Sequence, residues 1–220
     1  MSASVFVTGT GTEVGKTVVA AVIARTLASE GHTVHVFKPA VSGLDDYAGS
    51  DELPDHELLR LASGSDQGDD EIAPYRYGPP LSPHLAAELV GEAIEPALLL
   101  EAAGRASAGA DAFVCEGVGG FLVPLTPQYL IRDLARELAL PVFVVASPGL
   151  GTINHTLLTI GAVRAAGLEV SSVVLTPWHE RPEPLHRSNA ESIERLGKVE
   201  VKTLNSLDLA HPDSWPGLTV

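Results

Sequence analysis

The amino-acid sequence predicts a single α/β domain in which a mostly parallel sheet is flanked by helices. Short apolar segments alternate with longer segments of helical periodicity along most of the 220 residues. The apolar segments are rich in valine and are continuous, which is typical of strands buried on both faces. A chain of this length matches one domain, and ligands of such folds bind at the carboxyl ends of the strands.

The expected elements follow one another along the chain. The expected strands are residues 5–8, 33–38, 112–116, 141–146, 170–176 and 199–203. The expected helices are residues 16–29, 55–62, 83–90, 96–106, 129–138, 153–166 and 185–196. Gly31, Gly64 and Gly167 come just after three of these helices, where a left-handed cap favours glycine.

The segment 45–71 interrupts this alternation. It holds ten acidic residues and one arginine, Arg60, together with several glycines and serines. We expect it to be an excursion on the surface of the domain that contains one short helix.

The charge balance argues against nucleic-acid and membrane partners. Fourteen Lys and Arg stand against 28 Asp and Glu, which gives a net charge of −14 and a pI of about 4.8. Nucleic acids and anionic membranes bind basic surfaces. The one cysteine, Cys115, cannot form an internal disulfide, and neither a targeting segment nor an apolar run long enough for a membrane span is seen. We expect a soluble, cytoplasmic protein.

A glycine-rich loop between the first expected strand and the first expected helix is the strongest functional signal. It reads Gly-Thr-Gly-Thr-Glu-Val-Gly-Lys-Thr over residues 9–17. Backbone N–H groups of such a loop and the following helix N-terminus bind phosphate, Lys16 would reach the β- and γ-phosphates, and Thr17 would bind Mg²⁺. The general motif places its first glycine at position 10, whereas here Gly9 comes one residue earlier. The strand–loop–helix context predicts a P-loop NTPase-like fold.

The same glycines leave a second interpretation open. Gly9, Gly11 and Gly15 also resemble the turn of a dinucleotide-binding fold, which usually has an acidic residue at the end of its second strand. Here that strand ends in Lys38, which could meet a 2′-phosphate. A nicotinamide oxidoreductase is therefore an alternative, although it does not explain the Gly-Lys-Thr sequence.

Five sequence landmarks, taken in order, resemble the dethiobiotin synthase family. They are the loop 9–17, Lys-Pro-Ala-Val-Ser-Gly at 38–43, Ser-Pro-His at 82–84, Glu-Gly-Val-Gly-Gly at 116–120 and Leu-Gly-Thr-Ile-Asn-His-Thr at 150–156. The resemblance runs from residue 5 to about residue 176, and the unusual glycine spacing is that family's own form of the loop.

The resemblance implies an ATP-dependent ring closure of 7,8-diaminopelargonate with CO₂. One amine adds to CO₂ to give a carbamate, and the γ-phosphate of ATP is transferred to it to give a carbamic–phosphoric anhydride. The second amine then displaces phosphate and closes the cyclic urea of dethiobiotin. The resemblance also implies Mg²⁺, ATP as co-substrate, and a homodimer with the active site near the subunit interface.

The resemblance and the chemistry together assign the candidate site residues. Lys16 and Lys38 are the catalytic candidates, and Thr17, Asp55 and Glu116 are the candidate metal ligands. Nucleotide contacts are expected from Glu13, Val14, Gly15, Lys16, Thr17, Val18, Asp55, Glu116, Gly117, Val118, Gly119 and Thr176. Substrate contacts are expected from Thr12, Lys38, Ser42, Gly151, Thr152 and Asn154, the last three at a helix N-terminus that would hold the distal carboxylate across the dimer.

Several of these residues have a structural alternative. Lys38 could be a solvated lysine at a strand end, and Thr152 could cap its own helix. Asp55 could be a helix N-cap, with Asp51 as the competing metal ligand in the acidic segment.

One position departs from the family pattern. Thr176 stands where the family usually carries an asparagine that reads the adenine edge, and a single hydroxyl replaces a bidentate amide. Pro177 then removes a backbone donor. We therefore expect relaxed selection of the nucleotide base.

Two further functions remain alternatives. One is a related P-loop amidoligase on another substrate, although 220 residues leave no room for the amidotransferase domain that such proteins often carry. The other is a partitioning-type regulatory ATPase. Such proteins often have a basic tail, whereas residues 206–220 contain no Lys or Arg.

Overall fold

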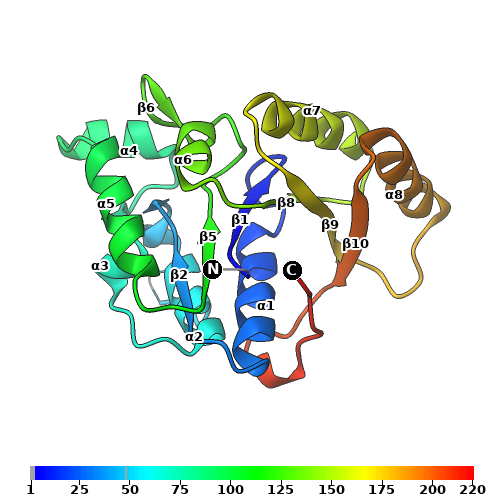
Figure 1. The fold of residues 1–220 in the computed structure, drawn as a ribbon, viewed down its shortest axis with the longest axis horizontal. Coiled ribbons are helices and arrows are strands. Elements are labelled where there is room, and N and C mark those ends of the chain that lie inside the picture. The colour runs from blue at the N-terminus through cyan, green and yellow to red at the C-terminus, as the bar shows by residue number, and fades with distance from the viewer. Residues whose placement is uncertain (1–2, 48) are drawn as a thin grey trace.

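A six-stranded, wholly parallel sheet lies at the centre of the computed structural model, which describes residues 3–47 and 49–220 (Figure 1). The strand order is β10-β9-β8-β1-β5-β2. Its strands are β1 (Val5–Gly9), β2 (Val34–Phe37), β5 (Ala112–Glu116), β8 (Val142–Ala146), β9 (Val170–Trp178) and β10 (Glu200–Asn205). All six expected strands are confirmed.

Eight α-helices are found in the described residues. They are α1 (Lys16–Ser29), α2 (Asp55–Ser63), α3 (Asp69–Ile72), α4 (Pro83–Val90), α5 (Pro96–Ser107), α6 (Ile131–Leu138), α7 (Thr152–Ala165) and α8 (Pro184–Gly197). Two small sheets pair β3 (Ala40–Val41) with β4 (Tyr75–Arg76) and β6 (Pro124–Thr126) with β7 (Tyr129–Leu130). None of these four short strands was expected from the sequence.

Apolar side chains pack on both faces of the central sheet. In β1, Val5 and Val7 belong to the cluster formed with α1 and α2, whereas Phe6 belongs to the cluster formed with α5, α6 and α7. All three are fully buried, which explains why the strands read as uninterrupted apolar segments. No helix in residues 3–47 and 49–220 is long and apolar enough to cross a membrane. The cytoplasmic location stays a prediction.

The helix expected at 129–138 begins two residues late. Tyr129 and Leu130 form β7, which pairs antiparallel with β6, so α6 starts at Ile131. The Asp133 carboxylate accepts a hydrogen bond from the Leu130 N–H at 2.9 Å and closes the first turn. The prediction failed there because the cross-strand pairing has no local sequence signal.

The acidic segment 45–71 is more than a surface excursion, so that expectation was partly wrong. It contains a 3₁₀ turn at Leu44–Tyr47, α2 and most of α3, and Leu58 and Leu59 of α2 pack against α1 in the core. Gln67 is buried and holds the edge strand β2: its Oε1 accepts from the Val36 N–H at 2.8 Å, and its Nε2 donates to the Val36 carbonyl at 3.1 Å.

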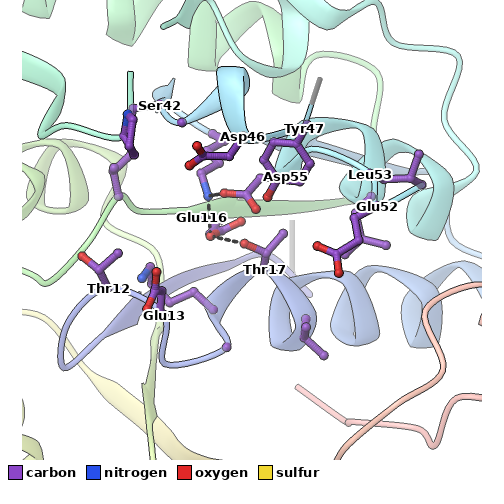
Figure 2. A pocket seen from close by; sticks show the side chains of 18 of the residues that line it. Thr12, Glu13, Thr17, Ser42, Asp46, Tyr47, Glu52, Leu53, Asp55 and Glu116 are labelled. Atoms are coloured by element: carbon purple, nitrogen blue, oxygen red, sulfur yellow. Dashed lines mark hydrogen bonds and ion pairs between the residues drawn. The ribbon is translucent and has the colours of Figure 1, made fainter. Parts of the chain in front are cut away.

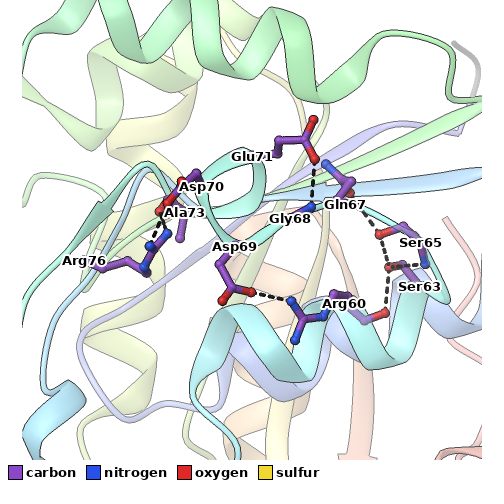
Figure 3. Close-up of polar contacts among 10 residues, drawn as sticks. All are labelled: Arg60, Ser63, Ser65, Gln67, Gly68, Asp69, Asp70, Glu71, Ala73 and Arg76. Carbon is purple, nitrogen blue, oxygen red and sulfur yellow. Dashed lines mark hydrogen bonds and ion pairs between the residues drawn. The ribbon is translucent and has the colours of Figure 1, made fainter.

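Two arginines neutralise part of the acidic charge near α3 (Figure 3). Arg60 of α2 forms an ion pair with Asp69, and Arg76 forms one with Asp70. The Gly68 N–H donates to the Glu71 carboxylate at 2.7 Å. The charge run is therefore organised by local pairs and remains mostly exposed.

His56 of α2 gives a testable pH dependence of stability. Its side chain is buried, Nδ1 has no hydrogen-bond partner, and burial lowers its pKa. Below about pH 6.5 the His56 side chain therefore binds a proton in the unfolded chain more readily than in the folded chain. The free energy of unfolding falls as the pH drops through that value. We expect a loss of up to about 1.4 kcal/mol per pH unit from this group. Urea unfolding of His56→Leu between pH 7.5 and 5.5 should show a flatter profile. The control variant His179→Leu, at an exposed position, should keep the wild-type pH profile. If the free energy of unfolding of wild type and of His56→Leu changed equally with pH, His56 would not be the group responsible.

Candidate functional site

A cavity of about 1250 Å³ opens at the carboxyl ends of the central strands (Figure 2). Its lining comes from the loop before α1, the ends of β2 and β5, the start of α2, the 3₁₀ turn at Leu44–Tyr47 and the C-terminal segment. This is the position that the fold class predicts for a ligand.

The glycine-rich loop is shaped by close contacts that exclude side chains at two positions. A Cβ on Gly9 would lie 2.7 Å from the Val14 methyl Cγ2, and a Cβ on Gly15, whose φ is +89°, would lie 2.7 Å from the Thr176 methyl. The Thr10 N–H donates to the Val145 carbonyl of β8 at 2.9 Å and so continues the sheet pairing. The position of Gly9, one residue earlier than in the general motif, therefore has a steric explanation, because a side chain there would clash with Val14.

Lys16 closes over the loop. Its ammonium donates a hydrogen bond to the Gly11 carbonyl at 2.8 Å, and the side chain is largely buried. Burial lowers the pKa of Lys16, with Glu116 opposing this effect. The ammonium is thus held beside the backbone N–H groups that would receive a phosphate.

Lys38 lies between two carboxylates. Its Nζ donates to Glu116 Oε1 at 2.6 Å and forms an ion pair with Asp55 (Figure 2). Burial alone would lower the pKa of Lys38, but the two carboxylates outweigh it and the pKa is raised. Because Lys38 is 3% exposed, the alternative of a solvated strand-end lysine is wrong.

The two carboxylates differ in their electrostatics. Burial raises the pKa of Glu116, with Lys38 opposing only part of that shift, whereas for Asp55 the Lys38 charge outweighs burial and the pKa is lowered. The difference follows exposure, because the Asp55 side chain is 32% exposed and that of Glu116 is fully buried. Asp55 is the first residue of α2 and Pro54 occupies the N-cap position, so the N-cap alternative is wrong. Asp51 is an exposed residue of the cavity wall.

The oxygen atoms around Lys38 fit a magnesium ion. Thr17 Oγ1 donates to Glu116 Oε1 at 2.9 Å, which places the hydroxyl beside the carboxylate. Glu116 Oε2 is buried and has no hydrogen-bond partner, which is costly unless a cation approaches it. Carboxylate and hydroxyl oxygens are ligands that Mg²⁺ accepts. Within the described ranges no group of three or more His, Cys, Asp or Glu could hold a metal. The oxygen atoms gathered here come from two carboxylates, Asp55 and Glu116, and the Thr17 hydroxyl.

The structure brings most of the expected site residues to the cavity. Besides the residues above, the lining includes Thr12, Glu13, Gly15, Val18, Ser42, Val118 and Gly119. Val14 and Gly117 belong to the same two turns, and Thr176 lies beneath the loop with its methyl group against Gly15.

The expected carboxylate site at the start of α7 is not part of this cavity. Gly151, Thr152 and Asn154 do not line it. Gly151 is the N-cap of α7, so the suggestion that Thr152 caps its own helix is wrong. The Thr152 hydroxyl is instead buried and lies 3.3 Å from that of Thr156.

Two groups of cavity residues were missed by the sequence interpretation. Asp46, Tyr47 and Glu52 come from the acidic segment, and burial together with the charge of Asp55 raises the pKa of Tyr47 (Figure 2). Leu207 and Leu209 come from the C-terminal segment. No local motif marks either group, because only the fold brings them to the loop.

This fold and loop define a protein of the P-loop NTPase-like class. The ATP-dependent dethiobiotin synthetase of Anaeromyxobacter dehalogenans (strain 2CP-1 / ATCC BAA-258) is 44% identical over 191 residues, which are 87% of this chain and 84% of that relative. The one from Bacillus subtilis (strain 168) is 36% identical over 198 residues, 89% of this chain and 84% of the relative. The chain belongs to the ATP-dependent dethiobiotin synthetase family, and it is an enzyme of the ligase class.

Two broader similarities agree with the fold class. Residues 3–205 match the AAA domain family. A solved ParA family ATPase from Chlorobium tepidum TLS has a TM-score of 0.57 at 15% identity, covering 95% of this chain and 88% of that chain. At that identity the likeness shows the fold alone. The resemblance drawn from the five landmarks is confirmed by the dethiobiotin synthetase relatives. These comparisons do not support the oxidoreductase, amidoligase or partitioning alternatives.

Proposed function

We propose that residues 1–220 act as one ligase domain that converts 7,8-diaminopelargonate, CO₂ and ATP into dethiobiotin, ADP and phosphate. The observation that carries this proposal is the buried Lys38 ammonium, fixed between Asp55 and Glu116 beside a phosphate-binding loop. Such a site supplies positive charge where a carbamate anion and a phosphoryl group would meet. Family membership supports the substrates, because the relatives are named for this product.

The proposed reaction has three steps. One amine attacks CO₂ and loses a proton, which forms a carbamate. A carbamate oxygen attacks the γ-phosphorus of ATP, and the bond to ADP breaks. The second amine attacks the carbonyl carbon of the resulting anhydride, phosphate leaves, a proton is released and the urea ring closes.

The side chains have separate roles in this proposal. Lys16 and the loop N–H groups hold the transferring phosphoryl group, since phosphoryl transfer depends on positioning and charge neutralisation. Lys38 stabilises the carbamate charge as it moves, and the Ser42 hydroxyl at the cavity wall hydrogen-bonds the diamine or carbamate. Thr17, Asp55 and Glu116 would hold Mg²⁺, which when bound supplies positive charge to the phosphate oxygens.

The nucleoside is proposed to lie at the apolar end of the cavity. Val18 of α1 and Leu207, Leu209 and Ala210 of the C-terminal segment are apolar residues of the cavity wall. Leu209 is 38% exposed, so its side chain is available to a ligand. Apolar contact stabilises any base without distinguishing its hydrogen-bonding edge.

The distal carboxylate of the diamine is proposed to bind at the start of α7 of a second copy of this chain. Gly151–Asn154 lie outside the cavity of their own chain, and the neighbouring Leu150 is 92% exposed. A homodimer that places this helix end over the partner's cavity would supply backbone N–H groups for the carboxylate.

Phosphate release tests the proposed function. Wild-type protein with ATP and Mg²⁺ should release phosphate only when both 7,8-diaminopelargonate and bicarbonate are present, and mass spectrometry should detect dethiobiotin in equal amount. Phosphate release that ignores the diamine would reject the ligase proposal.

Base selectivity is a separate prediction of this site. Because Thr176 replaces a bidentate amide and the nucleoside wall is apolar, kcat/KM for ATP, CTP and GTP should agree within about tenfold, or 1.4 kcal/mol. Steady-state turnover with each nucleotide, in the presence of the diamine and bicarbonate, measures this. A stronger preference for ATP would show that another group reads the adenine edge.

A further inference from the structure

The C-terminal segment 206–220 runs back along α1 after β10, and the C-terminus lies beside that helix (Figure 1). Its first part supplies Leu207, Leu209 and Ala210 to the cavity. Its last part is anchored: Leu218 is buried in the α1 cluster, and its N–H donates to the Thr26 hydroxyl at 2.9 Å. One segment therefore connects the apolar cavity wall to the far end of α1.

A second contact fixes the carbonyl of Asp208, which lies between the two leucines of the wall. The Trp215 indole Nε1 donates to that carbonyl at 2.8 Å, and the indole ring packs against the α1 cluster. The Asp208 carboxylate accepts from the Ala210 N–H at 3.0 Å and lies 2.8 Å from His211 Nδ1. These contacts close a turn over 208–211 whose backbone carries Leu209 and Ala210.

Two further attachments of the segment do not involve the 208–211 turn. Asp213 forms an ion pair with Arg25, but its side chain is 91% exposed, and pairs of this kind contribute little to stability. The Lys202 ammonium donates to the Thr219 carbonyl at 2.7 Å near the chain end. Leu207 packs against the α1 cluster itself, and Trp215 joins the same cluster to the 208–211 turn.

We propose that Trp215 is a positioning residue for nucleotide binding: its indole N–H holds the 208–211 turn so that Leu209 and Ala210 complete the nucleoside wall beside Leu207. Trp215 itself does not line the cavity, so it acts through that turn. The proposal rests on the proposed function in taking ATP as the ligand and in placing its nucleoside against this apolar wall. It predicts a loss confined to the nucleoside part of the nucleotide, because the phosphate loop lies at the other end of α1 from the Leu218 anchor.

Calorimetric binding of ATP and of inorganic tripolyphosphate, both with Mg²⁺ and without diamine, separates the two parts. Trp215→Phe keeps the aromatic packing and removes one hydrogen bond, so ATP should bind about three- to tenfold more weakly. Tripolyphosphate has no nucleoside and should bind as it does to the wild type. CTP should lose the same factor as ATP, since an apolar wall does not read the base.

Two further variants complete the test. Asp213→Asn removes only the exposed ion pair and should leave ATP binding unchanged, whereas Leu218→Ala, which loosens the buried anchor, should weaken ATP but not tripolyphosphate. An equal loss for both ligands in Trp215→Phe would mean that the phosphate loop has moved and would overturn the proposal. Unchanged ATP binding in Trp215→Phe would also overturn it. Because no diamine is used, these results are independent of the ligase assay.

Discussion

Replacement of Lys38 by alanine is expected to lower kcat by about 10³-fold or more, because it removes a preorganised positive charge from the reacting anion. The ammonium donates to Glu116 at 2.6 Å and pairs with Asp55, so its position is fixed before any ligand binds. Phosphate release with ATP, bicarbonate and 7,8-diaminopelargonate measures the loss. Fully retained turnover would contradict the role of Lys38.

Stability has to be separated from chemistry in this experiment. Removing Lys38 leaves the fully buried Glu116 with the Thr17 hydroxyl but without its charged partner, and breaking a buried pair in this way costs about 3–5 kcal/mol. The double variant Lys38→Met with Glu116→Gln removes one charge of each sign and should regain much of the lost stability. If its melting temperature recovers while its turnover stays well below that of Glu116→Gln alone, the loss caused by removing Lys38 is chemical. Lys198→Ala at an exposed position is the matched lysine control and should behave as the wild type.

The central sheet could be predicted because its signal is local. Strands such as β1 and β8 are buried along their whole length, so each reads as a continuous apolar segment. The phosphate loop could be predicted for the same reason, since Gly15, Lys16 and Thr17 are adjacent in the chain. Lys38 and Glu116 could be assigned to the same site because Lys38 follows β2 and Glu116 ends β5, and the carboxyl ends of parallel strands meet at one edge.

The parts that could not be predicted depend on contacts between distant segments. Gln67 pairs with the backbone of Val36, and the C-terminal leucines reach the cavity across α1. Nothing in the neighbouring residues of Gln67 distinguishes it from an exposed glutamine of an acidic loop. The acidic composition of 45–71 likewise concealed Leu58 and Leu59, whose burial depends on the position of α1.

Glu116→Gln is expected to lower activity with a smaller loss of stability than Lys38→Ala. The amide keeps an oxygen that can accept hydrogen bonds from Thr17 and Lys38. It removes the negative charge of the carboxylate, whose second oxygen, Oε2, has no hydrogen-bond partner. A magnesium ligand is lost, so kcat should fall by about 10²-fold and a higher Mg²⁺ concentration should be needed for half-maximal rate. Burial raises the pKa of Glu116, which means that its charge is costly in the folded state. Because Asp55 still pairs with Lys38 in this variant, the free energy of unfolding should fall by less than it does in Lys38→Ala.

A Mn²⁺ titration followed by electron paramagnetic resonance, in the presence of ADP, tests the metal role without turnover. Glu116→Gln should bind Mn²⁺ at least about tenfold more weakly than wild type, which corresponds to 1.4 kcal/mol. Asp51→Asn makes the same chemical change at the exposed cavity wall and should leave Mn²⁺ binding and kcat unchanged. A third variant, Asp55→Asn, decides between the two carboxylates of the acidic segment. Asp55→Asn should weaken Mn²⁺ binding, whereas Asp51→Asn should not. The reverse order would assign the metal to Asp51, and unaltered Mn²⁺ binding in Glu116→Gln would remove Glu116 from the metal site.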